Sequence, residues 1–265
     1  MKKPWRTDIW DILRIGAVFV TAYAVRIALN RLGAGFTGIT GYPMALRQLP
    51  NVCSEILLPQ IGVLAFTVTL IMRFGYASTI WVEPSLQAAR ASAARPPNDP
   101  IELDEHVNSR AFAELSLSPD PIPVPPRRSI PPFTRWLTTA FLLVASVVII
   151  HTTTSFTQHA SSYLLTAALG ISAIAFSTEL LFRGLLLAMI RDITHHEWLA
   201  ALIVTILYTL WAGGLGLLGA TFTDTAVHTL FAFFSGLGLY ALRVTTGHLW
   251  PAIALHAVWE FCFVM

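Results

Sequence analysis

Two pairs of ionisable residues interrupt hydrophobic segments at a spacing that suits chemistry. Glu179 and Arg183 lie within STELLFRGLL, and His256 and Glu260 lie in the last hydrophobic segment. Residues four apart share one face of a helix, so the members of each pair can interact. An ionised side chain in hydrocarbon costs about 2.5–3.5 kcal/mol on insertion scales, so it persists where it is paired, faces a cavity or serves a reaction. When only Glu179 and Arg183 are considered, a structural ion pair explains them as well as an active site does.

The composition predicts an all-α, polytopic membrane protein. Of the 265 residues, 55% are hydrophobic and 12% are charged, which is not the balance of a soluble domain. The net charge of +2 gives no indication of nucleic-acid binding. The two cysteines, Cys53 and Cys262, are far apart in the sequence and form neither a disulfide framework nor a CxxC metal site.

The hydrophobic segments divide the chain into three parts. Residues 1–78 are expected to form two membrane helices, and residues 136–265 a membrane domain of five more. Residues 79–135 contain most of the sixteen prolines and many charged residues, which predicts a disordered cytoplasmic linker. The seven predicted spans are residues 9–29, 56–72, 136–151, 162–190, 198–218, 226–244 and 249–265.

The basic residues predict the orientation of these spans. Lysines and arginines gather at the N-terminus, around residues 73–135, at Arg191 and at Arg243, whereas residues 152–161 and 219–225 contain none. With seven spans, all of these clusters fall on one side of the membrane. The N-terminus and the linker are therefore predicted to be cytoplasmic, and the C-terminus to lie on the opposite side.

Helical rise indicates which polar residues share a depth. Counting about 1.5 Å per residue from the cytoplasmic end of each span puts Arg183 and His256 about 12 Å deep, and Glu179 and Glu260 about 18 Å deep. His228 comes out about 24 Å deep, so we leave it out of the cluster. Glu179, His256 and Glu260 can bind a divalent metal such as zinc, or they can perform general acid/base chemistry, and both alternatives stay open.

These segments resemble the CPBP family, which comprises membrane-embedded CAAX proteases and bacteriocin-processing and immunity proteins. STELLFRGLL is similar to the EExxxRG motif of that family, and GLGLYALRVTTGHLWPAIALHAVWE is similar to its closing block, with a TGxLWP turn and an HxxxN motif. The resemblance covers about residues 136–265. It implies core helices that enclose a conical cavity in a bacterial plasma membrane, where glutamates and histidines activate water against a peptide bond near a substrate C-terminus.

The resemblance assigns roles to some residues and exposes three differences. Glu179 matches the second glutamate, Arg183 the arginine that braces the glutamates, and His256 the histidine of the last motif. Three expected polar positions hold other residues, namely Thr178 for the first glutamate, Ala212 for the histidine of the middle motif and Glu260 for the final asparagine.

The sequence favours an intramembrane endopeptidase in which Glu179 or Glu260 replaces the missing base, while its status as an enzyme stays open. The expected partners are a membrane-associated or lipidated peptide or protein substrate and the lipid bilayer, with no nucleic acid. The alternative is a catalytically inactive family member that binds a membrane peptide or partner protein as an immunity protein or scaffold. A small transporter that uses the glutamates as a proton relay is less well supported, because no inverted repeat is visible.

Overall fold

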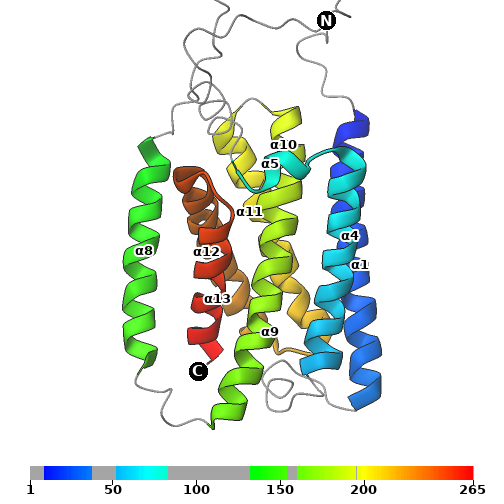
Figure 1. The fold of residues 1–265 in the computed structure, drawn as a ribbon, viewed down its shortest axis with the longest axis vertical. Helices are drawn as coiled ribbons and strands as arrows, with labels where there is room; N and C mark the ends of the chain where they lie inside the picture. The colour runs from blue at the N-terminus through cyan, green and yellow to red at the C-terminus, as the bar shows by residue number, and fades with distance from the viewer. Residues whose placement is uncertain (1–8, 38–51, 83–131, 154–159, 195, 265) are drawn as a thin grey trace, which may run out of the picture.

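The computed structural model describes residues 9–37, 52–82, 132–153, 160–194 and 196–264, and its elements in these ranges are helices (Figure 1). The main α-helices are α1 (Ile9–Thr37), α4 (Leu58–Phe74), α8 (Pro132–Thr153), α9 (Ser161–Glu179), α10 (Leu187–Ile193), α11 (Glu197–Gly213), α12 (Phe222–Thr246) and α13 (Trp250–Val264). The short elements are η1 (Val52–Leu57), α5 (Ala77–Ile80), η3 (Leu180–Leu186) and η4 (Gly214–Leu218). The predicted all-α fold is confirmed.

Several of these helices are long and apolar enough to cross a bilayer. Within the described ranges they are Ile9–Ala34, Ser161–Ile193, Glu197–Leu218 and Phe222–Thr246, and the apolar helices Leu58–Phe74 and Phe133–Ile149 are shorter. The second of them joins α9, η3 and α10 into 33 residues, which is longer than the roughly 20 residues that a bilayer core needs. The protein is an integral membrane protein, and a helix occupies each of the seven ranges predicted to span, although the number of spans stays a prediction.

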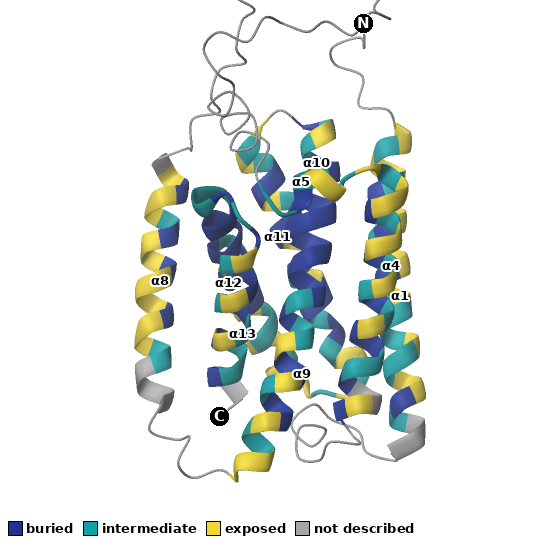
Figure 2. Ribbon diagram, in the orientation of Figure 1, coloured by how far each residue is buried: buried dark blue, intermediate teal, exposed yellow. Residues whose placement is uncertain are grey.

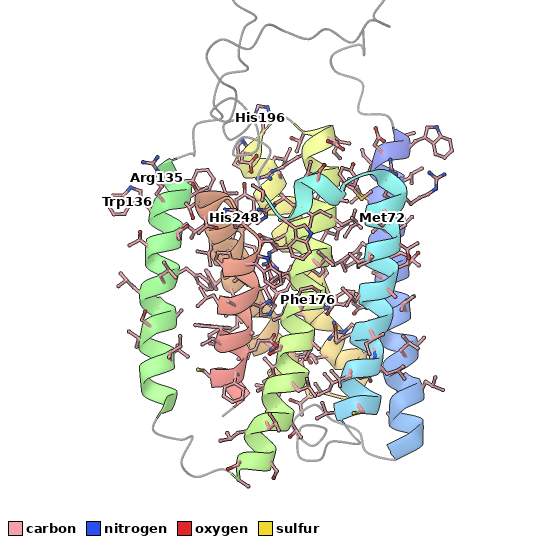
Figure 3. The ribbon with its side chains drawn as sticks, viewed as in Figure 1. Met72, Arg135, Trp136, Phe176, His196 and His248 are labelled. Atoms are coloured by element: carbon pink, nitrogen blue, oxygen red, sulfur yellow. The ribbon has the colours of Figure 1, made fainter. Side chains whose placement is uncertain are left out.

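The helices alternate in direction along the chain. α1, α8, α11 and α13 run from the end of the bundle where the N-terminus is marked, and α4, α9 and α12 return to it (Figure 1). Arg135, Trp136, His196 and His248 lie at that same end (Figure 3). The termini of the helices therefore lie at the ends that the seven-span topology requires.

The bundle is organised around the long helix that contains α9 and η3. This helix packs against α4 and α13, while α12 packs against α8, α11 and α13. Every residue of η3 is buried, whereas the outward faces of α1, α4 and α8 are exposed (Figure 2). Many exposed side chains on these faces are large and apolar, such as Leu143 and Val147, as expected for helices that face lipid.

The first helix is longer than the sequence predicted, and its charges face the protein. The helix continues to Thr37, whereas the prediction ended at residue 29. The guanidinium carbon of Arg14 lies 3.6 Å from the centroid of the Phe74 ring, and Nη1 of Arg26 donates to the carbonyl of Trp211 at 2.8 Å. Both arginines thus find partners inside the bundle, as expected for charged side chains in an apolar segment.

Residues 75–82, which follow α4, connect the N-terminal helices to the C-terminal helices through hydrogen bonds and ring stacking. Nη2 of Arg243 in α12 donates to the carbonyl of Ile80 at 2.6 Å, and the amide of Leu249 donates to the carbonyl of Trp81 at 3.3 Å. The rings of Trp81 and Trp250 stack with centroids 5.2 Å apart. A buried arginine that satisfies the C-terminal carbonyls of the short helix α5 replaces the bonds that water would supply at a solvent-exposed helix end.

These contacts also correct the boundaries of the predicted linker, 79–135. The described chain continues through α5 to Val82 and resumes with α8 at Pro132, so both ends of that range belong to the folded part. Residues 83–131 lie outside the described residues, and their predicted disorder stays a prediction.

Candidate functional site

The local structure around the first motif departs from a regular α-helix. Glu179 ends α9, and Arg183 lies in η3, a π-helical turn. Turns of this kind inside α-helices are rare and occur frequently at functional sites. A Cβ atom added at Gly184 would lie 3.1 Å from Cγ2 of Ile80, so glycine at this position allows α5 to approach the turn closely.

Glu179 is the centre of a buried charged group. Its Oε1 accepts a hydrogen bond from Nη1 of Arg183 at 2.7 Å and lies 2.8 Å from Nδ1 of His256. The side chains of all three residues are at most 2% exposed. The predicted pairing of Glu179 with Arg183 is confirmed, and the structure adds His256 from α13 as a second partner of the same oxygen.

Arg183 also connects this group to α11 and α12. Its Nη2 donates to the carbonyl of Gly236 at 3.1 Å, and its guanidinium carbon lies 4.2 Å from the centroid of the Tyr208 ring. A Cβ atom at Gly236 would lie 3.1 Å from Cδ1 of Tyr208 and 3.5 Å from Nη2 of Arg183. The glycine therefore permits the close contact between α12 and the arginine. Arg183 braces Glu179, as the resemblance implied for the arginine of the motif.

His256 connects the buried group to a more exposed carboxylate. Its Nε2 lies 3.3 Å from Oε1 of Glu260 and 3.2 Å from the hydroxyl of Tyr208. The side chain of Glu260 is 19% exposed. The two carboxylates thus contact opposite nitrogens of one imidazole. A neutral imidazole that donates from Nδ1 to Glu179 has an acceptor at Nε2, so a proton can pass between Nε2 and Glu260.

This arrangement bears on the metal site predicted from Glu179, His256 and Glu260. Within the described residues, there is no group of three His, Cys, Asp or Glu side chains placed to hold a metal ion. Both nitrogens of His256 instead contact carboxylate oxygens, so the three donors do not converge on one point. A bound metal therefore stays a prediction from the sequence. Elemental analysis of the purified protein would test it.

Two of the three altered positions add no polar group to the cluster. The hydroxyl of Thr178 donates to the carbonyl of Ile174 at 2.7 Å, within its own helix. Ala212 is buried at the position where the resemblance expects a histidine. Glu260, at the third position, is the altered residue that joins the cluster through His256.

The structure adds residues that the sequence did not place near the cluster. His228 of α12 and Arg26 of α1 interact electrostatically with Glu260. Gln60 of α4 is buried, and its Oε1 accepts a hydrogen bond from the hydroxyl of Ser177 at 2.5 Å, two residues before Glu179. The charge of Arg26 inside an apolar segment was a signal in the sequence, but no pattern there identified its partner.

Comparison with known proteins agrees with the motifs. Residues 159–262 match the model of the family described as type II CAAX prenyl endopeptidase Rce1-like. No curated protein and no solved structure matches the chain. The matched range includes Glu179, Arg183, His256 and Glu260, whereas Arg26 and Gln60 lie outside it. The C-terminal region of the chain, residues 159–262, is therefore similar to the CAAX proteases of that family.

Proposed function

We propose that the chain is a CAAX-type intramembrane endopeptidase that hydrolyses a peptide bond near the C-terminus of a membrane-associated or lipidated substrate. Glu260 is the general base. One observation carries this assignment, namely that Glu260 is 19% exposed and yet lies 3.3 Å from Nε2 of the buried His256. A group that takes a proton from water must reach water, and in this cluster the carboxylate of Glu260 does so best.

Glu179 is less suited to act as the base. Its side chain is fully buried, and its Oε1 is already engaged by Arg183 and by Nδ1 of His256. These two contacts hold the carboxylate in place inside the bundle, away from water. Glu179 instead holds the imidazole in one orientation, as a carboxylate does for the catalytic histidine of hydrolytic triads.

The reaction then needs four events. A water beside Glu260 gives its proton to the carboxylate, and its oxygen bonds to the carbonyl carbon of the substrate. The negative charge that develops on the carbonyl oxygen is stabilised by donors such as the Tyr208 hydroxyl, which lies 3.2 Å from Nε2 of His256. The proton passes to the nitrogen of the scissile bond, directly or through Nε2 of His256. The carbon–nitrogen bond breaks and releases an amine and a carboxylic acid.

The assay compares three proteins on a membrane-tethered peptide library. We expect wild type to cleave, and Glu260→Gln to be slower by about 10²–10⁴-fold, the usual contribution of a positioned general base. Thr178→Glu restores the first glutamate of the motif and should cleave faster than wild type. Cleavage by Glu260→Gln at the wild-type rate would remove Glu260 from this role. If neither wild type nor Thr178→Glu cleaves any peptide, the chain is the inactive, peptide-binding member of the family.

The proposal also covers the location of the protein and its orientation in the membrane. We infer a seven-span protein of a bacterial plasma membrane, with residues 1–8 and 83–131 in the cytoplasm. The alternating helices (Figure 1) and the position of Arg135 at the end where the N-terminus is marked (Figure 3) support this orientation. Alkaline-phosphatase fusions at Ser118 and after Met265 should give low and high activity, respectively. High activity at Ser118 would reverse the orientation.

A further inference from the structure

Arg14 of α1 differs from other arginines of the membrane helices in its partners. Arg183 donates to a carboxylate, and Arg26 and Arg243 donate to backbone carbonyls. The guanidinium carbon of Arg14 instead lies 3.6 Å from the centroid of the Phe74 ring, and the side chain forms no hydrogen bond or ion pair within the described residues. Its Nε is buried without a hydrogen-bond partner among them. The ring is neutral, so the charge of Arg14 has no counter-ion in the described part of the chain.

The position of Arg14 along α1 brings it to the level of the lipid headgroups. The first candidate span begins at Ile9, so Arg14 lies only about 7.5 Å along the helix at a rise of 1.5 Å per residue. A long arginine side chain at this depth reaches the membrane surface. Trp10, four residues earlier on the same face, is strongly exposed, as tryptophans at a membrane interface commonly are.

A second arginine lies beside the ring on which Arg14 is stacked. Phe74 ends α4, and the residue before it, Arg73, is exposed, as is Met72. α4 packs along α1 (Figure 1), so these positions lie on neighbouring helices at the same end of the bundle. Stacking on Phe74 occupies one face of the Arg14 guanidinium and leaves its N–H edge, which matches the oxygens of a phosphate in a planar, bidentate geometry.

Two carboxylates of this region do not neutralise Arg14. The hydroxyl of Tyr76 donates to Oδ2 of Asp192 in α10. Asp11 lies one turn before Arg14 on α1, and no ion pair joins the two within the described residues. Both carboxylates interact electrostatically with Tyr76, as Arg14 does. Their charges weaken the attraction for an anion, so binding one should require both Arg14 and Arg73.

We propose that Arg14, stacked on Phe74, and Arg73 together bind the phosphate of an anionic phospholipid in the leaflet at this end of the bundle. The phosphate supplies the counter-ion that Arg14 lacks, and it connects α1 to α4 because each helix contributes one arginine. The site is independent of the proposed hydrolysis, since both arginines lie outside the family-matched range 159–262.

The experiment uses the full chain in nanodiscs of phosphatidylcholine, of phosphatidylcholine with phosphatidylglycerol, and of phosphatidylcholine with inorganic phosphate in the buffer. Native mass spectrometry measures retained phosphatidylglycerol, and melting temperature measures stabilisation. Wild type should retain phosphatidylglycerol and melt higher with it. Arg14→Gln should lower the affinity for this lipid about tenfold, because a hydrogen bond to a charged group is lost, and Arg73→Gln should lower it less.

Three further variants distinguish a built site from general attraction of anionic lipid to positive charge. Arg135, at the same end of the bundle, is also exposed, so Arg135→Gln is the matched control and should bind like wild type (Figure 3). Arg14→Lys keeps the charge without the fork, and Phe74→Leu keeps the charge without the ring. Both should weaken binding although the net charge is unchanged.

Several outcomes would overturn the site. General attraction would make Arg135→Gln as weak as Arg14→Gln and leave Arg14→Lys and Phe74→Leu like wild type. Equal melting temperatures of wild type with and without phosphatidylglycerol would also exclude the site, and an equal rise with inorganic phosphate would exclude a lipid as its specific ligand. If Arg14→Gln does not fold, Arg14→Lys and Arg73→Gln decide, since each should lose affinity in a protein that melts at the wild-type temperature in phosphatidylcholine alone.

Discussion

The two halves of the site differ in how their charges are satisfied. The inner group consists of Glu179, Arg183 and His256, which are buried and bonded to one another. The outer group consists of Glu260, His228 and Arg26, which are partly exposed and interact through their charges. Every member of the inner group lies in the family-matched range 159–262, whereas Arg26 of the outer group comes from α1.

From this difference we expect the inner group to set the geometry of the site and the outer group to affect activity more than the fold. A buried ion pair contributes little net stability, yet losing one partner is costly because a charge remains without its counter-ion. Oε2 of Glu179 is buried without a hydrogen-bond partner, so this carboxylate depends strongly on the contacts of Oε1. Substitutions in the inner group should therefore damage the fold, and substitutions in the outer group should damage activity first.

The largest expected loss of stability is that of Arg183→Ala, at about 3–5 kcal/mol in the free energy of unfolding. The substitution leaves the Glu179 carboxylate buried without its counter-ion and also removes the bond to the carbonyl of Gly236. Glu179→Gln should cost less, because the amide keeps a hydrogen-bonding group of similar shape. Melting temperatures of the detergent-extracted proteins measure both. A larger loss for Glu179→Gln would show that the pair does not stabilise the inner group.

A smaller loss is expected for Gln60→Leu, which tests whether the inner group extends to α4. Oε1 of Gln60 accepts from the hydroxyl of Ser177 at 2.5 Å between two buried side chains. Removing one partner should cost about 1–3 kcal/mol, whereas the double variant Gln60→Leu/Ser177→Ala should recover part of that loss. The coupling free energy from the four melting curves is the measurement, with Thr69→Ala on the same helix as an exposed control. Additive losses in the cycle would mean that the bond contributes nothing.

The smallest effect on stability should be that of Glu260→Gln, at less than about 1 kcal/mol, because the amide keeps a hydrogen-bonding group of similar shape beside His256. Its side chain is partly exposed, and glutamine can still donate to or accept from the neighbouring groups. A small loss of stability together with the large loss of rate expected for Glu260→Gln would show that Glu260 contributes to the reaction more than to the fold. A drop in melting temperature as large as that of Arg183→Ala would remove the distinction between the two groups.

The sequence alone was sufficient for the features that depend on local spacing. Hydrophobic segments predicted a helix in each of the seven ranges, because a helix in lipid satisfies its own backbone groups and its length follows from the apolar run. The spacing of four residues predicted the pair of Glu179 and Arg183, and the same spacing brings His256 to Glu260. The motif residues also predicted the family.

Tertiary structure decided which partners come from distant helices. The contact of Arg26 with Trp211 joins residues 185 positions apart, and no local pattern encodes it. The direction of the Thr178 hydroxyl and the placement of two carboxylates on opposite nitrogens of His256 depend on how α9, α11, α12 and α13 pack together. Side-chain partners follow from that packing, because a group buried in lipid or protein must satisfy its hydrogen bonds with whichever helix lies beside it.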